Sequence, residues 1–396
     1  MLILVTDDIV KNYDGGVAVP DSHGTHNDLH SEHGAMPGEH LGRAKNPVIK
    51  VDDIAWLEFE KPDLRSTEAF AHAFGFATAA RSDTELHLRG VLAGSPCVIV
   101  RRGPRSRFTG TAFRAADQVD VLRLAEATGA QLLRLPDPLG GVVVNLRDPN
   151  GADVRVVSDT LTLPALPTSP ARSYNYGDAV NRVNATQRPG REPASIERLG
   201  HVVLQSTRFR ETLDWYLLHL GLIVSDFKYF EGQRTKGPTM GFIRCDRGSV
   251  PTDHHTLALA LGPRNRYVHS AFQVPDLDSL AAGGQHLVDQ GYTRSWGIGR
   301  HIEGSQIFDY WRDPDGLLVE HFTDGDVFDH TVAPGWSPMT ASGLAQWGPP
   351  VSRDFLGADP RRAETLREVG SMVASLRGDN EFDLTRLRGL MKVAMT

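Results

Sequence analysis

Residues 299–322, GRHIEGSQIFDYWRDPDGLLVEHF, predict a β-hairpin. A strand ends at Trp311, an Asp-Pro-Asp-Gly turn occupies 313–316 and a return strand covers 317–322, because Pro presets φ and Gly accepts the positive φ of a tight turn. On the return strand Glu320 shares one face with the apolar residues two positions before and after it. A carboxylate on an apolar face is costly to bury unless it is paired or binds a metal. We therefore expect a partner for Glu320 elsewhere in the chain.

The hairpin has a twin in the first half of the chain. The letters RDPNG at 147–151 match RDPDG at 312–316, and in this alignment Arg155 stands where the later copy has Glu320. Two further matches join Ile54-Ala55-Trp56 to Leu199-Gly200-His201, and Thr111-Ala112-Phe113 to Ser270-Ala271-Phe272, so that Trp56 aligns with His201 and Gly110 with His269. Internal periodicity identifies an architecture better than any single element does. Only the second copy carries His, His and Glu at the equivalent points.

Around these motifs the chain repeats one order of strand, helix and three strands. We therefore predict an α+β fold of four tandem β-α-β-β-β modules. The expected domains are an N-terminal arm at 1–47, a paired-module domain at 48–160, a Pro-, Ser-, Asn- and Arg-rich linker at 161–193, a second paired-module domain at 194–325 and a C-terminal extension at 326–396. In the extension, helices are predicted at 360–376 and 383–395; it is expected to cover a site, to build a subunit contact, or only to pack on the surface.

Composition narrows the class of partner. The net charge of -7, with acids and bases mixed along the chain, argues against nucleic acid and favours a small molecule. No stretch approaches the roughly 20 apolar residues of a membrane span, so we expect no membrane insertion. The two distant cysteines, Cys97 and Cys245, favour a reducing compartment. We expect a cytoplasmic homo-oligomer.

The N-terminal arm contains a series of histidines, namely His23, His26, His30, His33 and His40. Their spacing has neither cysteines nor helical periodicity to support a metal site. We interpret this segment as an irregular arm laid over the body of the protein or over a neighbouring subunit.

His201, His269 and Glu320 together predict a metal centre. Two imidazoles and one carboxylate from three strands form the facial triad of non-haem iron(II) sites with open positions. Taken singly, each residue also has a structural interpretation, as a hydrogen-bonded histidine or as a glutamate on an edge strand. Their coincidence at repeat-equivalent positions of one half only favours the metal. We expect Fe(2+), with Mn(2+) as the alternative because the same ligands accept both.

The chain resembles the type I extradiol ring-cleavage dioxygenases of the vicinal oxygen chelate superfamily, over about residues 48–325. The motifs that carry the resemblance are Leu199-Gly200-His201-Val202, Asp253-His254-His255-Thr256-Leu257-Ala258, the strand around His269, Gly299-Arg300-His301, and the series Tyr310, Asp313-Pro314, Gly316 and Glu320. The resemblance implies the glyoxalase/bleomycin-resistance/extradiol dioxygenase fold, in which the modules build two open barrels and only the second, catalytic one holds iron. The absence of ligands at Trp56, Gly110 and Arg155 agrees with it.

The resemblance also implies an activity and roles for individual residues. The activity is extradiol (meta) cleavage of a catechol-type aromatic by dioxygen, which gives a 2-hydroxymuconic semialdehyde-type product in aromatic catabolism. His201, His269 and Glu320 would be the metal ligands. His255 would face the dioxygen site as a hydrogen-bond donor and proton carrier. Tyr310 and His301 would contact the substrate oxygens.

Fewer residues bear on the substrate and on the rival functions than on the metal site. Trp296, Ile298 and Arg300 are predicted to line the substrate pocket. Trp296 and Ile298 suggest an apolar or aryl-substituted catechol, whereas Arg294 keeps a carboxylated one possible. One rival is a 4-hydroxyphenylpyruvate-type Fe(II) dioxygenase with the same triad, against which His255, His301 and Tyr310 argue. The other is a non-catalytic binding protein of the same superfamily, against which four modules and an intact triad argue.

Overall fold

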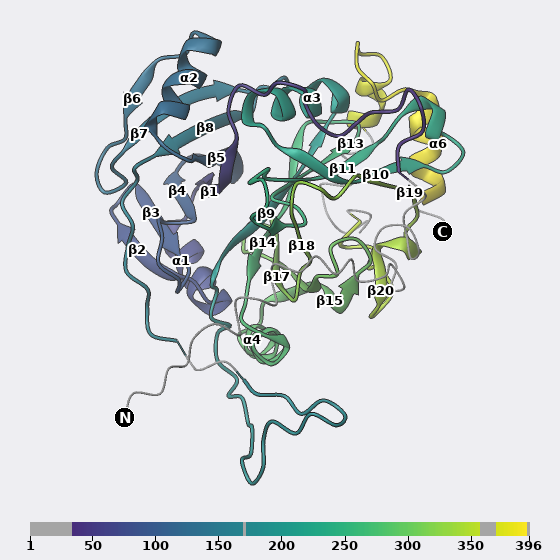
Figure 1. The fold of residues 1–396 in the computed structure, drawn as a ribbon. Helices are drawn as coiled ribbons and strands as arrows, with labels where there is room; N and C mark the ends of the chain where they lie inside the picture. The colour runs from purple at the N-terminus through teal and green to yellow at the C-terminus, as the bar shows by residue number, and fades with distance from the viewer. Residues whose placement is uncertain (1–33, 169–171, 357–369, 394–396) are drawn as a thin grey trace, which may run out of the picture.

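The computed structural model describes residues 34–168, 172–356 and 370–393. Two large β-sheets dominate this part of the chain, and they lie side by side in Figure 1, the first half in blue and the second in teal and green. Within the described ranges, no helix has both the length and the apolar character needed to cross a membrane.

The first sheet has eight strands in the order β2-β3-β4-β1-β5-β8-β7-β6. These are β1 (Val51–Lys61), β2 (Ala77–Arg81), β3 (Glu85–Arg89), β4 (Val98–Arg102), β5 (Arg107–Ala115), β6 (Leu132–Arg134), β7 (Val142–Arg147) and β8 (Asp153–Ser158). Helix α1 (Leu64–Phe74) follows β1, and α2 (Gln118–Thr128) follows β5. Each helix begins after an aspartate, Asp63 or Asp117, whose carboxylate accepts backbone N–H bonds, and ends at a left-handed glycine.

The second sheet has ten strands in the order β19-β10-β11-β13-β9-β14-β17-β16-β15-β20. These are β9 (Arg198–Ser206), β10 (Ile223–Phe230), β11 (Met240–Arg244), β13 (Leu257–Leu261), β14 (Arg266–Gln273), β15 (Thr293–His301), β16 (Ile307–Arg312), β17 (Leu318–Thr323), β19 (Gly335–Met339) and β20 (Ala345–Trp347). Helices α3 (Phe209–Leu220) and α4 (Leu277–Asp289) follow β9 and β14, and the short strands β12 (Thr252–Asp253) and β18 (Val327–Phe328) pair with each other.

The strand pairing confirms the four β-α-β-β-β modules. Strand β1 pairs parallel with β4 and antiparallel with β5, which pairs parallel with β8; β9, β13, β14 and β17 repeat this pattern. The register also agrees, since Ala112 lies opposite Arg155 in the first half and Ala271 lies opposite Glu320 in the second. The sequence alignment of Arg155 with Glu320 is therefore also a structural equivalence.

The C-terminal extension completes the second sheet at both edges. Its strand β19 pairs with β10, and β20 pairs with β15. Added strands satisfy edge N–H and C=O groups that would otherwise invite pairing with other chains. Of the two predicted C-terminal helices, 383–395 corresponds to α6 (Leu384–Val393), whereas 360–376 lies largely outside the described residues.

Among the buried contacts between the two halves, two involve the hairpin that carries Glu320. The Lys61 ammonium of β1 lies 2.5 Å from a carboxylate oxygen of Asp313 and 2.7 Å from one of Asp315, both in the turn of the hairpin β16–β17. The His321 ring stacks on Phe74 and its Nε2 lies 2.7 Å from the Phe74 carbonyl oxygen. The first half therefore supports the hairpin that carries Glu320.

The described segments before the first module and between the two halves are irregular, as expected. Residues 34–50 lie against the second half: Gly42 and Arg43 bond to β10, and His40 lies 2.8 Å from Asp214 on α3. The remaining arm histidines, His23, His26, His30 and His33, lie outside the described residues. The described part of 161–193 has no named strand or helix and forms the loops that extend from the body at the bottom of Figure 1. The exact domain boundaries stay predictions.

Candidate metal centre

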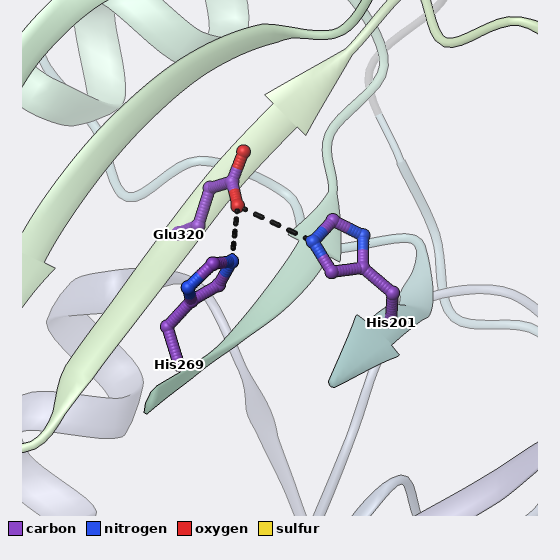
Figure 2. Close-up of side chains that lie close together, drawn as sticks. All are labelled: His201, His269 and Glu320. Carbon is purple, nitrogen blue, oxygen red and sulfur yellow. Dashed lines mark ion pairs between the residues drawn. The ribbon is translucent and has the colours of Figure 1, made fainter. Parts of the chain in front are cut away.

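Three neighbouring strands bring His201, His269 and Glu320 together. His201 comes from β9, His269 from β14 and Glu320 from β17, and these strands are adjacent in the sheet. One oxygen of Glu320 lies 3.5 Å from Nε2 of His201 and 3.3 Å from Nε2 of His269. Figure 2 shows the three side chains converging on one point. One donor atom from each lies within 4.8 Å of the others, so a single ion could contact all three.

Burial and the lack of hydrogen bonds indicate that this group is built for a cation. Glu320 is 0% exposed and His201 is 1% exposed. Among the described residues, neither carboxylate oxygen of Glu320 and neither ring nitrogen of His269 has a hydrogen-bond partner of acceptable geometry. Buried polar atoms normally have hydrogen-bond partners, so buried atoms that lack one point to a bound ligand or ion. Two imidazoles and a carboxylate are the donor set expected for a divalent transition metal.

The electrostatics of the group also suit a metal. Burial lowers the pKa of His201, which keeps its imidazole neutral and able to donate a lone pair. Burial alone would raise the pKa of Glu320, but contacts with His201 and His269 outweigh it and hold that pKa well below its usual range. The group therefore offers a carboxylate charge and, at His201, a neutral imidazole, as metal binding needs.

His255 lies against this group as predicted. It is 4% exposed, and its ring centroid lies 4.0 Å from that of His201. Burial, together with the surrounding histidines, lowers the pKa of His255 well below its usual value. The adjacent His254 contacts His255 through Nδ1 but directs its Nε2 toward Asp226. This separation of the two rings agrees with the prediction that only His255 faces the metal position.

Tyr310 and His301 are the second pair of predicted residues that the structure brings to the triad. Tyr310 lies opposite Glu320 in the β16–β17 pair, and its ring centroid is 5.2 Å from that of His269. Nε2 of His301 lies 2.8 Å from the Tyr310 hydroxyl, and its Nδ1 lies 2.7 Å from the Leu344 carbonyl. A carbonyl only accepts, so Nδ1 of His301 donates to it and Nε2 accepts the Tyr310 hydroxyl proton. The Tyr310 oxygen therefore retains its own lone pairs for another donor.

An apolar wall lies beside Tyr310, and part of it comes from the C-terminal extension. Trp296, Phe308, Tyr310 and Leu318 form one cluster, against which Leu344 and Phe355 pack. The Phe355 ring centroid lies 4.8 Å from those of Tyr310 and Trp296, and the Trp296 indole donates to the Pro349 carbonyl. The extension therefore covers this side of the site. No sequence motif singled out Leu344 or Phe355 in advance.

The other residues predicted for the pocket have contacts elsewhere. Ile298 packs with Ala194, Val274, Leu280 and Ile307 in a separate cluster. Arg300 bonds to the Ser305 carbonyl and to Asp324. Arg294 pairs with the buried Asp309 through two nitrogens at 3.0 Å. These contacts do not support a pocket role for Ile298 or Arg300, and they leave Arg294 engaged with a protein carboxylate.

The first half shows what replaces the triad when its residues are lost. Trp56 and Arg155, which occupy the positions of His201 and Glu320, both bond to the buried Glu58, and Arg101 bonds to its other oxygen. Gly110 has no side chain, and an added Cβ would lie 2.6 Å from the Asp153 carbonyl oxygen. In the first half the equivalent position is therefore filled by hydrogen-bonded ion pairs of Glu58 with Arg155 and Arg101. Glu320, by contrast, has no hydrogen-bond partner of acceptable geometry among the described residues.

Comparisons with known proteins agree with this fold and site. Residues 198–321, which contain the triad, match the family model of the Glyoxalase/Bleomycin resistance protein/Dioxygenase superfamily. The chain is 30% identical over 317 residues to metapyrocatechase 2 of Cupriavidus necator, covering 79% of this chain and 94% of that protein. The chain therefore belongs to the extradiol ring-cleavage dioxygenases of that superfamily.

Solved structures share the fold at lower identity. The Mn(II)-bound glyoxalase from Novosphingobium aromaticivorans aligns with a TM-score of 0.63 at 23% identity, over 76% of this chain and 91% of that one. The homoprotocatechuate 2,3-dioxygenase of Brevibacterium fuscum, in its anaerobic complex with 3,4-dihydroxyphenylacetate, aligns with a TM-score of 0.63 at 18% identity, over 80% of this chain and 95% of that one. Both therefore share the overall fold of this chain.

Proposed function

We propose that this protein cleaves the ring of a catechol beside its two hydroxyl groups, at an Fe(II) ion held by His201, His269 and Glu320. Both atoms of dioxygen enter the product, a 2-hydroxymuconic semialdehyde-type acid, and no external reductant is consumed. The observation that carries the proposal is the buried Glu320 carboxylate, which lies between His201 and His269 and has no hydrogen-bond partner of acceptable geometry among the described residues. Tyr310 and His255 lie beside this group. The family membership supports the same reaction.

The metal would supply Lewis acidity toward the catechol oxygens and open positions for an organic chelate and dioxygen. The chain's own residues then hold substrate and protons. The Tyr310 oxygen, fixed by its bond to His301, would accept a hydrogen bond from a substrate hydroxyl. His255, neutral at rest, would accept a substrate proton and return it during ring opening. Trp296, Phe308 and Phe355 would exclude water from the aromatic ring.

The wall favours an apolar or aryl-substituted catechol. Trp296 and Phe355 present aromatic faces, and the Arg294 guanidinium is already paired with Asp309. A homo-oligomer is also part of the proposal; the strongly exposed Val180 and Val183 in the linker support it, and light scattering of the eluted protein would measure it.

Activity of the metal-loaded protein tests this proposal. Anaerobically iron-loaded protein given a catechol and then air is expected to develop the yellow absorbance of a muconic semialdehyde. Manganese loading in parallel would show which metal supports turnover. Consumption of 4-hydroxyphenylpyruvate with catechols untouched would favour the rival dioxygenase instead.

Ligand variants test the site. Glu320→Gln and His201→Ala are each expected to lose iron retention and activity. Asp148→Asn is the matched control, because Asp148 is also a buried carboxylate, but it belongs to the turn of the first-half hairpin. Full activity in either ligand variant would refute the ligand assignment.

A further inference from the structure

A buried hydrogen-bonded chain leads away from the metal site through three side chains. Nδ1 of His254 lies 3.0 Å from Nδ1 of His255, and Nε2 of His254 lies 2.6 Å from a carboxylate oxygen of Asp226. Asp226 is 2% exposed, His254 1% and His255 4%. The chain therefore runs from the interior of β10 to a histidine that contacts His201, with little access to water.

Several contacts hold the middle ring of this chain in place. The His254 N–H donates to the Asp326 carbonyl, and the His254 carbonyl accepts the Ser225 hydroxyl. The ring packs edge-on against Phe328 and at a tilt against Phe242. Gly304 leaves room for it, since a Cβ at that position would lie 2.9 Å from Nδ1 of His254. This packing would not be needed for a histidine that only filled space.

With Asp226 ionised and His254 neutral, the two hydrogen bonds assign the proton positions of both rings. An ionised carboxylate can only accept, so Nε2 of His254 carries the hydrogen that points to Asp226. A neutral His254 then has its lone pair on Nδ1, and the short contact with His255 requires His255 to donate from its own Nδ1. The remaining nitrogen of His255, Nε2, is left unprotonated. That is the form in which His255 can take a proton from a substrate hydroxyl.

We propose that Asp226 and His254 are positioning residues that fix the ring orientation and the tautomer of His255. The inference rests on the proposed function of His255 and extends it to two residues for which neither the family match nor the metal triad gives a role. The two contacts hold the His255 ring in one orientation with Nδ1 directed to His254, which leaves Nε2 as the ring nitrogen free of this chain.

Asp226→Asn is the sharpest perturbation of this chain. The amide keeps the size of the carboxylate, but it can donate as well as accept, so it no longer dictates which nitrogen of His254 carries the proton. Asp148→Asn is the control, because it makes the same change at another buried carboxylate. Asp148 accepts a hydrogen bond from the Tyr216 hydroxyl and has no part in the His254–His255 chain.

The first readout needs no metal. In the ¹⁵N spectrum of histidine-labelled apo protein, wild type and Asp148→Asn are expected to show Nδ1 of His255 protonated and its Nε2 unprotonated. The His255 signals are identified by their loss in His255→Gln. Asp226→Asn is expected to lose that single tautomer. A wild-type His255 protonated at Nε2, or an unchanged spectrum in Asp226→Asn, would overturn the proposal whatever the enzyme's activity.

The second readout uses the iron-loaded full chain. Partners that orient a functional histidine are typically worth 10- to 100-fold, so kcat of Asp226→Asn is expected to fall by about that factor, with iron content and the KM for catechol within about twofold of wild type. Asp226→Asn/His255→Gln is expected to be no slower than His255→Gln, because Asp226 acts through His255. The proposal would be overturned if the falls in kcat of the two single variants multiplied in the double variant. A kcat of Asp226→Asn within twofold of wild type would also overturn it. An inactive wild type with the expected tautomers would instead refute the proposed function.

Discussion

Replacing Lys61 with methionine is expected to destabilise the second half of the protein from a residue in the first. Lys61 is 4% exposed and lies within 2.7 Å of carboxylate oxygens of both Asp313 and Asp315. Methionine keeps most of the apolar stem but removes the ammonium. Asp313, itself 9% exposed, is then left as a buried charge without its cation.

The expected loss of unfolding free energy in Lys61→Met depends on the hydrogen bonds and solvent that still reach the Asp313 and Asp315 carboxylates. Breaking a buried ion pair by removing one partner costs about 3–5 kcal/mol. One oxygen of Asp313 still accepts the backbone N–H groups of Asp315 and Leu317, and the Asp315 side chain is 25% exposed, so water can solvate it. We therefore expect the low end, about 3 kcal/mol. The double variant Lys61→Met/Asp313→Asn is expected to recover most of this loss, because no buried charge is left unpaired.

Urea unfolding followed by tryptophan fluorescence measures this loss, and hydrogen exchange of peptides covering 307–323 locates it. Arg107→Met is the control: its pair with Glu60 is bidentate, but Arg107 is 48% exposed, so the change is expected to cost under about 1 kcal/mol. A loss in Lys61→Met no larger than in the control, or no recovery in the double variant, would refute the reasoning.

Three further predictions concern single side chains. Burial lowers the pKa of His321 to about 4. Between pH 6.5 and 4 the unfolded chain therefore binds more protons than the folded chain, and the free energy of unfolding should fall by up to about 3 kcal/mol as the pH drops through this window. His321→Gln should flatten this pH dependence in urea titrations repeated at several pH values. Phe355→Ala is expected to raise kcat/KM for aryl-substituted catechols severalfold relative to catechol, since it removes the ring that packs on Tyr310 and Trp296; an unchanged preference would show that Phe355 does not limit the pocket. Tyr310→Phe removes the hydroxyl that donates to Nε2 of His301 and is expected to lower kcat at least about 10-fold with iron content unchanged; wild-type turnover would remove Tyr310 from the reaction.

The repeat made the fold and the triad predictable from the sequence. Matching letters around the two hairpins aligned Arg155 with Glu320, and the strand register confirmed that alignment. Because β-sheet pairing preserves which residue faces which, a loss of ligands in one copy could be read directly from the letters. His255, Tyr310 and His301 needed the family motifs in addition.

The packing of Ile298 outside the Trp296 cluster has a local cause. Strict alternation along a strand puts Trp296 and Ile298 on the same face. The pairing of β15 with β16 shifts register between Trp296 and Gly299, and Ile298 lies inside this irregularity. A bulge of this kind turns following side chains to the other face, and nothing in the letters TRSWGIGR announces it.

Other parts of the site depend on contacts between distant segments. Asp226 lies on a strand whose residues are all buried, so no alternation marks it as a partner of His254. Phe355 reaches Tyr310 only because β20 adds to the edge of β15 and Asp354 bonds to Arg312 and Ser295. Such contacts are set by tertiary packing and are not visible in local patterns.

The central claim is extradiol cleavage at the metal held by His201, His269 and Glu320, and mass spectrometry of the product formed under ¹⁸O₂ tests it most directly. Iron-loaded wild-type protein supplied with catechol is expected to give a ring-opened product that carries two labelled oxygens, and Glu320→Gln is expected to give none. Product with a single labelled oxygen, an intact ring, or equal yield from Glu320→Gln would contradict the account.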